Sequence, residues 1–248
     1  MQSKRARLDR FLSSYLQINR KDVRLMLAHN RVTLDGVVAK NIDQLVDEFS
    51  RIVLDGRVLQ TNSRVYLMLN KPVGVVSATR DEKHRTVIDL LDNRVDKSAL
   101  HIVGRLDLNS SGLLLLTNDG RWSRQLTSPQ NKVTKVYQVT LQNPLSQEYI
   151  AAFEGGMYFA YENITTQPAK LQILSEYVAQ VSLTEGRYHQ IKRMFGRFRN
   201  PVLHLHRTAI GALSLDPELA PGQSRELTAY ESTHINTPIE HKLATDDG

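Results

Sequence analysis

The segment 101–116 constrains the fold more than any other part of the chain. Two apolar runs, His101-Ile-Val and Leu113-Leu-Leu-Leu, enclose the polar stretch Gly104-Arg-Leu-Asp-Leu-Asn-Ser-Ser-Gly112. Short apolar runs bounded by glycine are typical of buried strands, and a polar stretch between two of them is typical of an exposed loop. The pattern therefore predicts strand, loop and strand, with Asp107 at the loop edge, where functional side chains are frequently found.

Composition limits the chemistry and the partners. The chain has 248 residues, 41% of them hydrophobic, which is enough for one large domain and one small one. It has no cysteine, which excludes disulfides, thiolate metal sites, iron–sulfur clusters and a thiol nucleophile. No apolar run is long enough to span a membrane, and the N-terminus lacks the apolar core of a signal peptide. We therefore expect a cytoplasmic protein without a membrane partner.

The positive charge is concentrated in separate segments. The formal net charge is +6, and segment 185–207 holds six basic residues with Glu185 as its only acid. The C-terminal part from Asp216 onward is acidic by contrast. A basic footprint spread over separate segments suits a phosphate backbone better than a single charge run does, so the charge pattern favours a nucleic-acid partner.

Residues 1–60 predict a small module of two helices and a hairpin sheet. Apolar residues between Leu8 and Leu16 recur at helical spacing, and the pattern repeats between Val23 and Leu27. Asp35-Gly36 and Asp55-Gly56 predict tight hairpin turns. Such a unit could be a packing cap, but small basic modules of this kind usually bind a partner.

Three blocks of this module resemble the S4 family of RNA-binding domains, over about residues 5–57. They are Arg7-Leu-Asp-Arg-Phe-Leu12, Asn19-Arg-Lys-Asp-Val23 and Asn30-Arg-Val-Thr-Leu-Asp-Gly36. The resemblance implies that the module presents a set of basic side chains to RNA phosphates, namely Arg5, Arg7, Arg20, Lys21, Arg24 and Arg31. Such contacts position a protein on RNA and carry little sequence information. Glycine is common where this chain has Asn30, and asparagine also tolerates a left-handed backbone.

The remainder of the chain predicts a larger α+β domain. Segment 60–64 has the polar composition of a linker, so we expect domains over 1–60 and 61–231, followed by a disordered tail over 232–248. Strand patterns are interleaved irregularly with a few helices, including a basic helix over 188–198. Because no regular β-α-β alternation is present, the pattern favours a mixed, mainly antiparallel sheet.

Four ordered blocks of this domain resemble the pseudouridine synthases that act on ribosomal RNA, over about residues 64–228. They are Leu67-Met-Leu-Asn-Lys-Pro-Val-Gly74, Gly104-Arg-Leu-Asp107, Lys135-Val-Tyr-Gln-Val139 and Glu185-Gly-Arg-Tyr-His-Gln-Ile-Lys-Arg-Met-Phe195. The resemblance implies an isomerase that breaks the N1–C1′ bond of a uridine, turns the base over and rejoins it through C5. It also implies that no cofactor and no metal are needed, and that Lys71 and Pro72 shape the loop under the active site.

The same resemblance assigns roles to individual side chains. Asp107 is expected to be the nucleophile, Tyr137 to stack on the flipped base, and Lys192 to be the basic partner of the aspartate. A cation beside a buried carboxylate favours its charged form. Further contacts to RNA are expected from Arg105, Arg187, His189 and Arg193.

Without the resemblance, these residues have simpler interpretations. Asp107 could accept hydrogen bonds from the backbone amides that follow it and so cap a turn. Tyr137 lies on an alternating strand and could be a core residue. His204 and His206 fall on one side of a strand, but no third ligand is evident. We therefore expect them to face RNA or to be structural rather than to bind a metal.

The block Gly186-Arg-Tyr-His-Gln-Ile-Lys-Arg193 resembles the branch of the family that acts on the small ribosomal subunit. The expected substrate is one uridine of small-subunit ribosomal RNA, either as RNA or in a small-subunit assembly intermediate, and the enzyme is expected to be a monomer. Gln167 stands where lysine is expected, and large-subunit ribosomal RNA is the alternative target. A non-catalytic RNA-binding ribosome-assembly factor is a second alternative. A sugar-directed hydrolase is a weaker one, because such enzymes usually need a second carboxylate.

Overall fold

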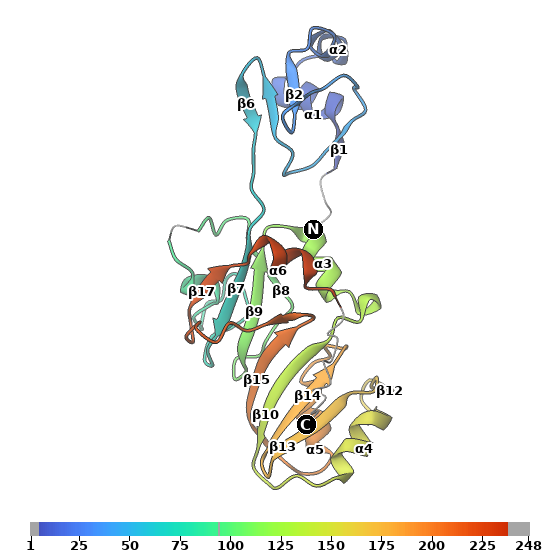
Figure 1. Cartoon of the computed structure of the whole chain (residues 1–248), viewed down its shortest axis with the longest axis vertical. Helices are drawn as coiled ribbons and strands as arrows, with labels where there is room; N and C mark the ends of the chain where they lie inside the picture. Colours follow the sequence, from blue (N-terminus) through green and yellow to red (C-terminus); the bar gives the residue numbers. More distant parts are fainter. Residues whose placement is uncertain (1–4, 94, 238–248) are drawn as a thin grey trace, which may run out of the picture. The chain divides into compact units, whose positions relative to one another are not determined.

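A computed structural model describes residues 5–93 and 95–237 of the chain. The chain divides into two compact units with the boundary between Arg64 and Val65 (Figure 1). The polar segment 60–64 thus ends the first unit, whereas the sequence analysis assigned most of it to the second. None of the described helices is long and apolar enough to cross a membrane.

The N-terminal unit combines two helices with short antiparallel strands. Its elements are β1 (Ala6–Arg7), α1 (Leu8–Leu16), α2 (Arg20–Ala28), β2 (Val32–Leu34), β3 (Val37–Val38), β4 (Leu45–Val46), β5 (Ile52–Leu54) and β6 (Arg57–Gln60). The main sheet has the order β3-β2-β5-β6, while β1 pairs with β4. Apolar faces of both helices pack on this sheet, with Leu12 and Val23 fully buried.

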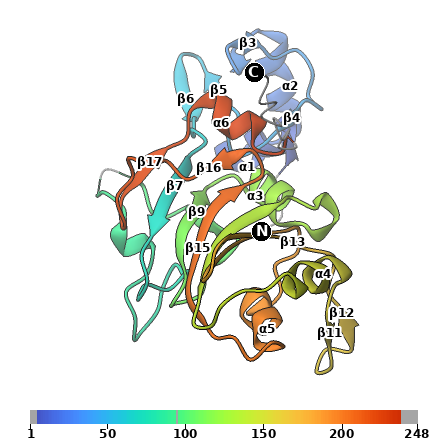
Figure 2. The same cartoon turned by 60° about the horizontal axis from the view of Figure 1, so that its bottom comes forward.

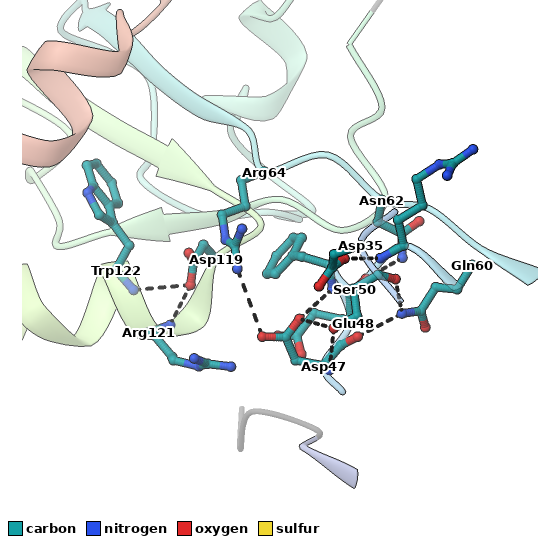
Figure 3. A network of polar contacts seen from close by, with 12 residues as sticks. Asp35, Asp47, Glu48, Ser50, Gln60, Asn62, Arg64, Asp119, Arg121 and Trp122 are labelled. Atoms are coloured by element: carbon teal, nitrogen blue, oxygen red, sulfur yellow. Dashed lines mark hydrogen bonds and ion pairs between the residues drawn. The ribbon is translucent and has the colours of Figure 1, made fainter. Parts of the chain in front are cut away.

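Local chemistry explains the turns of this unit. Asp35 and Gly36 have φ of 51° and 84°, and Asp55 and Gly56 have φ of 48° and 81°, as the predicted hairpin turns require. Asn30 has φ 56°, the left-handed conformation expected of it. At the end of β6 the Gln60 side chain donates to the backbone oxygens of Asp47 and Ser50 at 2.7 and 2.8 Å, which fixes the loop before β5 (Figure 3).

The second unit contains the remaining elements, which begin at Tyr66. They are β7 (Tyr66–Lys71), η1 (Ile88–Leu90), β8 (His101–Val103), β9 (Ser111–Thr117), α3 (Gly120–Thr127), η2 (Pro129–Asn131), β10 (Lys135–Leu141), α4 (Glu148–Gly155), β11 (Tyr158–Phe159), β12 (Ile164–Thr165), β13 (Lys170–Ser175), β14 (Val178–Leu183), α5 (Gln190–Gly196), β15 (Val202–Ile210), β16 (Leu213–Ser214), β17 (Ser224–Glu226) and α6 (Ala229–His234).

A nine-stranded sheet organises this unit. Its strand order is β13-β14-β10-β15-β9-β7-β17, with β16 on β15 and β8 on β9. Strands β15 and β9 pair in parallel, and the other neighbours in this order pair antiparallel. The predicted α+β class with a mixed, mainly antiparallel sheet is therefore confirmed.

The leucine run of β9 is buried on both faces of the sheet. Leu114 and Leu116 belong to one apolar core, and Leu113 and Leu115 belong to another. Helices α4 and α5 contribute aromatic and aliphatic side chains to the first core, and α3 contributes to the second. Figure 2 shows the ribbons of these helices alongside the sheet. Because both faces are covered, the sequence of this strand is a continuous apolar run rather than an alternating one.

Helix α3 is fixed at its start by Asp119, whose carboxylate accepts hydrogen bonds from the backbone amides of Arg121 and Trp122 at 2.9 and 3.2 Å (Figure 3). The Trp122 indole then donates to the backbone oxygen of Ser232 at 2.8 Å. This contact ties the second core to the C-terminal end of the described chain.

The expectation of disorder from residue 232 is wrong for residues 232–237. Helix α6 begins with a capping box between Thr228 and Glu231, and Ile235 is buried in the second core. A single apolar residue in a polar segment gives no periodic pattern, which is why the sequence did not predict this anchor. The rest of the predicted tail, residues 238–248, lies outside the described residues.

Candidate active site

The loop between β8 and β9 carries Asp107, and β8 and β9 pair antiparallel on either side of it. At the start of β9, Gly112 has φ 103°, and a Cβ there would lie 2.3 Å from the backbone oxygen of Arg207. Only glycine therefore lets β15 approach the end of the loop this closely. The glycine that ends the loop in the sequence thus also brings the C-terminal strand β15 against it.

Two basic side chains of the α5 region face the Asp107 carboxylate. The His189 Nε2 atom lies 3.2 Å from Asp107 Oδ2, and the Lys192 Nζ atom lies 4.0 Å from the same oxygen. His189 precedes α5 with φ 49°, a left-handed conformation in which histidine is enriched but still uncommon. The Asp107 side chain keeps 36% of its exposure, so the carboxylate stays accessible to a ligand.

Lys71 binds the backbone of the Asp107 loop. Its side chain is fully buried, and Nζ donates to the backbone oxygens of Pro72, Asp107 and Ser110 at 2.9, 3.1 and 2.7 Å. Burial lowers the pKa of Lys71 to about 8, the charge of Asp107 opposes this, and the charge of Arg207 adds to it. An ammonium group with three N–H donors matches three carbonyls, so Lys71 holds the middle of the loop and its second end.

Tyr137 and Arg207 lie side by side in the sheet, on β10 and β15. Arg207 is 3% exposed, and its guanidinium donates to the backbone oxygens of Leu113 and Arg105 and to the Tyr137 hydroxyl at 2.8, 3.4 and 3.5 Å. A guanidinium has no acceptor, so the Tyr137 oxygen accepts and its own proton is left for another partner. Among the described residues, Arg207 Nη2 and the Ser110 hydroxyl are buried without a hydrogen-bond partner.

These groups surround one pocket of about 710 Å³. Its walls come from the Asp107 loop, from β10 and β15, and from the segment between β14 and α5. Asp107 and Glu185 are the acids in its lining, whereas five basic residues contribute, namely Arg105, Lys135, Arg187, His189 and Arg207. The volume is in the range of small-ligand sites, and the basic lining suits an anionic ligand.

The structure brings most of the predicted site residues of the large domain together. Asp107, Tyr137, Arg105, Arg187 and His189 line the same pocket, and Lys192 approaches it through Asp107. Arg193 has a different environment. Its guanidinium forms a bidentate ion pair with Glu162 and lies 3.7 Å from the centroid of the Phe159 ring. Arg193 therefore holds the β11–β12 hairpin against α5.

The predicted RNA contacts of the N-terminal unit have two kinds of environment. Arg7 pairs with Asp9 at 3.1 Å, and Arg31 binds both oxygens of Asp55. Arg5 and the α2 residues Arg20, Lys21 and Arg24 are exposed. The helix α2 therefore offers three basic side chains on a single short element.

Arg207 is the main site residue that sequence reasoning missed. Arg207 lies on the buried face of β15, since its neighbours on that face, Leu205 and Ala209, are also less than a tenth exposed. An arginine in the apolar phase of an alternating strand was the signal that could have identified it. In the same strand, His206 binds Ser111 at 2.8 Å, and the described residues contain no group of three His, Asp or Glu residues placed to hold a metal.

Comparison with known proteins gives a consistent result. Residues 65–196 match the family described as RNA pseudouridylate synthase. The chain is 47% identical to "Ribosomal small subunit pseudouridine synthase A" of Pseudomonas aeruginosa, with 91% of this chain and 98% of that protein covered. It is 40% identical to the protein of the same name in Escherichia coli K12, with 92% and 99% covered. A solved structure titled "Crystal structure of pseudouridylate synthase" is 36% identical, with TM-score 0.67 over 92% of this chain and 99% of that one.

Proposed function

This chain belongs to the RNA pseudouridylate synthase family, and we propose that it converts one uridine of small-subunit ribosomal RNA into pseudouridine. Support for the target comes from relatives whose names state that branch and which match over nearly their whole length. The chemistry is an isomerisation: the N1–C1′ bond breaks, a C5–C1′ bond forms, and the proton of C5 is released while N1 takes one up.

The observation that carries this proposal is the position of Asp107. Its carboxylate is partly exposed and lines a pocket whose charged side chains are mostly basic, with His189 and Lys192 beside one oxygen and Lys71 donating to its backbone oxygen. In this proposal Asp107 is the nucleophile, as carboxylates are in enzymes that cleave bonds at a sugar carbon. Lys192 and His189 hold the carboxylate in place, and the Lys192 ammonium balances its charge.

Tyr137 receives the flipped base. The residue is 8% exposed and belongs to the lining of the pocket. A base turned out of the RNA stack is commonly held against an aromatic ring. Because Arg207 donates to the Tyr137 oxygen, the phenol proton is directed away from Arg207 and can be donated to the substrate.

In this proposal the N-terminal unit binds RNA phosphates through Arg20, Lys21 and Arg24 of α2, as an S4-type module. The proposal includes a monomeric enzyme. Its substrate, either ribosomal RNA or a small-subunit assembly intermediate, places it in the cytoplasm.

Tritium release from RNA labelled at uridine C5 tests the proposal, because the C5 proton is lost while the mass of the nucleoside stays the same. The substrates are small-subunit ribosomal RNA, a small-subunit assembly intermediate and large-subunit ribosomal RNA. We expect release from a small-subunit substrate and none with Asp107→Asn, which should still bind the RNA. Release from large-subunit RNA alone would contradict the target. No release from any substrate, with RNA binding retained, would contradict the catalytic function.

A further inference from the structure

Tyr188 is a large aromatic residue at the rim of the pocket that the mechanism above does not use. It contributes to the pocket lining, yet 75% of it is exposed. Its ring stacks on the His189 ring, with centroids 3.9 Å apart and planes 19° apart. Because His189 in turn contacts Asp107, an exposed aromatic ring, an imidazole and the carboxylate form one continuous series of contacts.

The stack on His189 and a hydrogen bond to the Tyr188 backbone oxygen restrain the Tyr188 ring. His189 adopts the left-handed backbone conformation that places its ring between Tyr188 and Asp107. The Tyr188 backbone oxygen lies 3.5 Å from Arg193, whose guanidinium is itself held by Glu162. An uncommon backbone conformation kept in place by several contacts is typical of functional sites. A ring held in this way loses little conformational entropy when it binds a flat partner.

The surroundings identify the kind of partner. The charged side chains of the pocket lining are mostly basic, which suits nucleic acid and opposes a basic peptide. Tyr137 is nearly buried in the pocket wall and takes the target base, whereas Tyr188 is exposed at the rim. Flipping a nucleotide leaves its neighbours without a stacking partner on one side, and aromatic side chains readily replace such a partner.

We propose that Tyr188, stacked on His189, is the platform on which a nucleobase adjacent to the target uridine stacks. This inference rests on the proposed function, because it places a second base of the same RNA beside Asp107. The target base occupies the pocket, its neighbour covers the Tyr188 ring, and His189 links the platform to the catalytic carboxylate. Tyr188 thus helps to hold the RNA in the conformation that presents a uridine to the site.

The chain contains a matched control for this platform. Tyr230 is 71% exposed and stacks on His234 with centroids 4.1 Å apart and planes 17° apart, but it is not part of the pocket lining. Its substitution removes an equally exposed tyrosine from an equivalent ring pair. Any general effect of losing such a pair on folding or solubility therefore appears in both variants.

The first test measures the affinity of small-subunit ribosomal RNA at fixed salt in an Asp107→Asn background, where no turnover occurs. We expect Tyr188→Leu to weaken binding about tenfold, as loss of one base–aromatic stack does. Tyr188→Phe keeps the flat ring and should bind as the parent does, and Tyr230→Leu should be unaffected. Equal affinity of Tyr188→Leu and its parent would overturn the inference, whether or not the wild-type chain releases tritium.

The second test identifies the base and separates the two proposals. In the RNA fragment around the target uridine, an abasic nucleotide replaces each neighbour in turn. At the base that stacks on Tyr188, we expect the abasic change to weaken wild-type binding about tenfold and to leave Tyr188→Leu unchanged. The inference would be overturned if Tyr188→Leu and the abasic change weakened binding independently of each other at every neighbouring position. Tritium release by the wild-type chain would in that case leave the proposed function intact. In turnover, we expect Tyr188→Leu to raise KM more than it lowers kcat.

Discussion

Basic side chains are used differently in the two units of this protein. In the N-terminal unit, Arg31 is matched by Asp55 in an exposed pair with both side chains nearly half accessible. In the second unit, Lys71 and Arg207 are buried, and their hydrogen-bond partners are mainly backbone carbonyls around one loop. His189 and Lys192 both face the carboxylate that this loop carries.

The exposed basic residues are available to bind RNA, whereas the buried ones stabilise the fold around the pocket. An exposed pair is screened by water and salt and contributes little to stability, so it can be exchanged for an RNA phosphate. A buried cation bound to carbonyls has no such freedom, because losing it leaves several buried acceptors without a donor. Substitutions of the buried cations should therefore affect folding and turnover, and substitutions of the exposed basic residues of the first unit should affect RNA affinity.

The largest effect is expected from Arg207→Met, which keeps much of the apolar stem but removes the guanidinium. The backbone oxygen of Leu113 and the Tyr137 hydroxyl then lose their donor. We expect unfolding free energy to fall by about 3 kcal/mol and kcat by at least about tenfold. Urea unfolding and tritium release measure both. Arg207→Lys keeps the charge but lacks the planar guanidinium, so its unfolding free energy and its kcat should lie between those of the wild type and Arg207→Met.

A variant of Arg207 with wild-type stability and kcat would contradict the structural role assigned to the buried cations. A loss of RNA affinity alone would also contradict it, since that is the behaviour expected of the N-terminal unit.

Lys71 should make stability and activity respond to pH in opposite directions. Its pKa is about 8 in the folded chain and near its ordinary value of 10.5 when unfolded, so between these values the unfolded chain binds more protons. Unfolding free energy from Lys71 therefore rises with pH in this window, by at most about 1.4 kcal/mol per pH unit. The deprotonated amine has two N–H groups for three carbonyls, so it holds the Asp107 loop less firmly. We therefore expect kcat to fall as pH rises through about 8.

The measurement is urea unfolding and tritium release between pH 7 and 10, with Lys71→Arg as the control that does not titrate in this range. A fall of kcat above pH 8 that is the same in Lys71→Arg would assign the pH effect to another group.

The smallest effect on the fold is expected in the N-terminal unit. Replacing Arg20, Lys21 and Arg24 of α2 by glutamine should leave unfolding and kcat unchanged, because all three are exposed. RNA affinity should fall, and the dependence of log K on log salt should become shallower by about 0.7 to 0.9 for each phosphate that the variant no longer binds. Salt titrations of binding measure this slope.

Asp55→Asn is the matched control, since it removes a charge of opposite sign from the same unit. It frees Arg31 for a phosphate, so affinity should stay the same or rise slightly. An unchanged salt slope in the α2 variant would remove this helix from the RNA-binding surface.

The sequence predicted the features of the fold that depend on short-range chemistry. The strand–loop–strand around Asp107 and the Asp-Gly turns are confirmed, because residues within a few positions determine them. Asn30 adopts the left-handed conformation that asparagine tolerates in place of glycine. The anchoring of residue 235 was missed, because an isolated apolar residue acquires its meaning only from the core that it fills.

The site was predictable to the extent that its residues lie in recognisable blocks. Asp107, Tyr137 and His189 come from three such blocks, and the structure places all three around one pocket. Arg207 lies in none of them, and its role follows from contacts with residues about a hundred positions earlier in the chain. Arg193 lies in a block and yet serves the β11–β12 hairpin, which shows that a motif does not fix the direction of every side chain in it.

The parallel contact between Gly112 and Arg207 determines when this protein can begin to work during its own synthesis. The Asp107 loop leaves the ribosome early, but the strand that completes its surroundings, β15, is among the last to be made. Pairing over such a sequence separation is slow to form and cannot start before its second partner exists. A nascent chain that ends before Val202 therefore carries the aspartate without the complete pocket, and it gains activity only after β15 has been made.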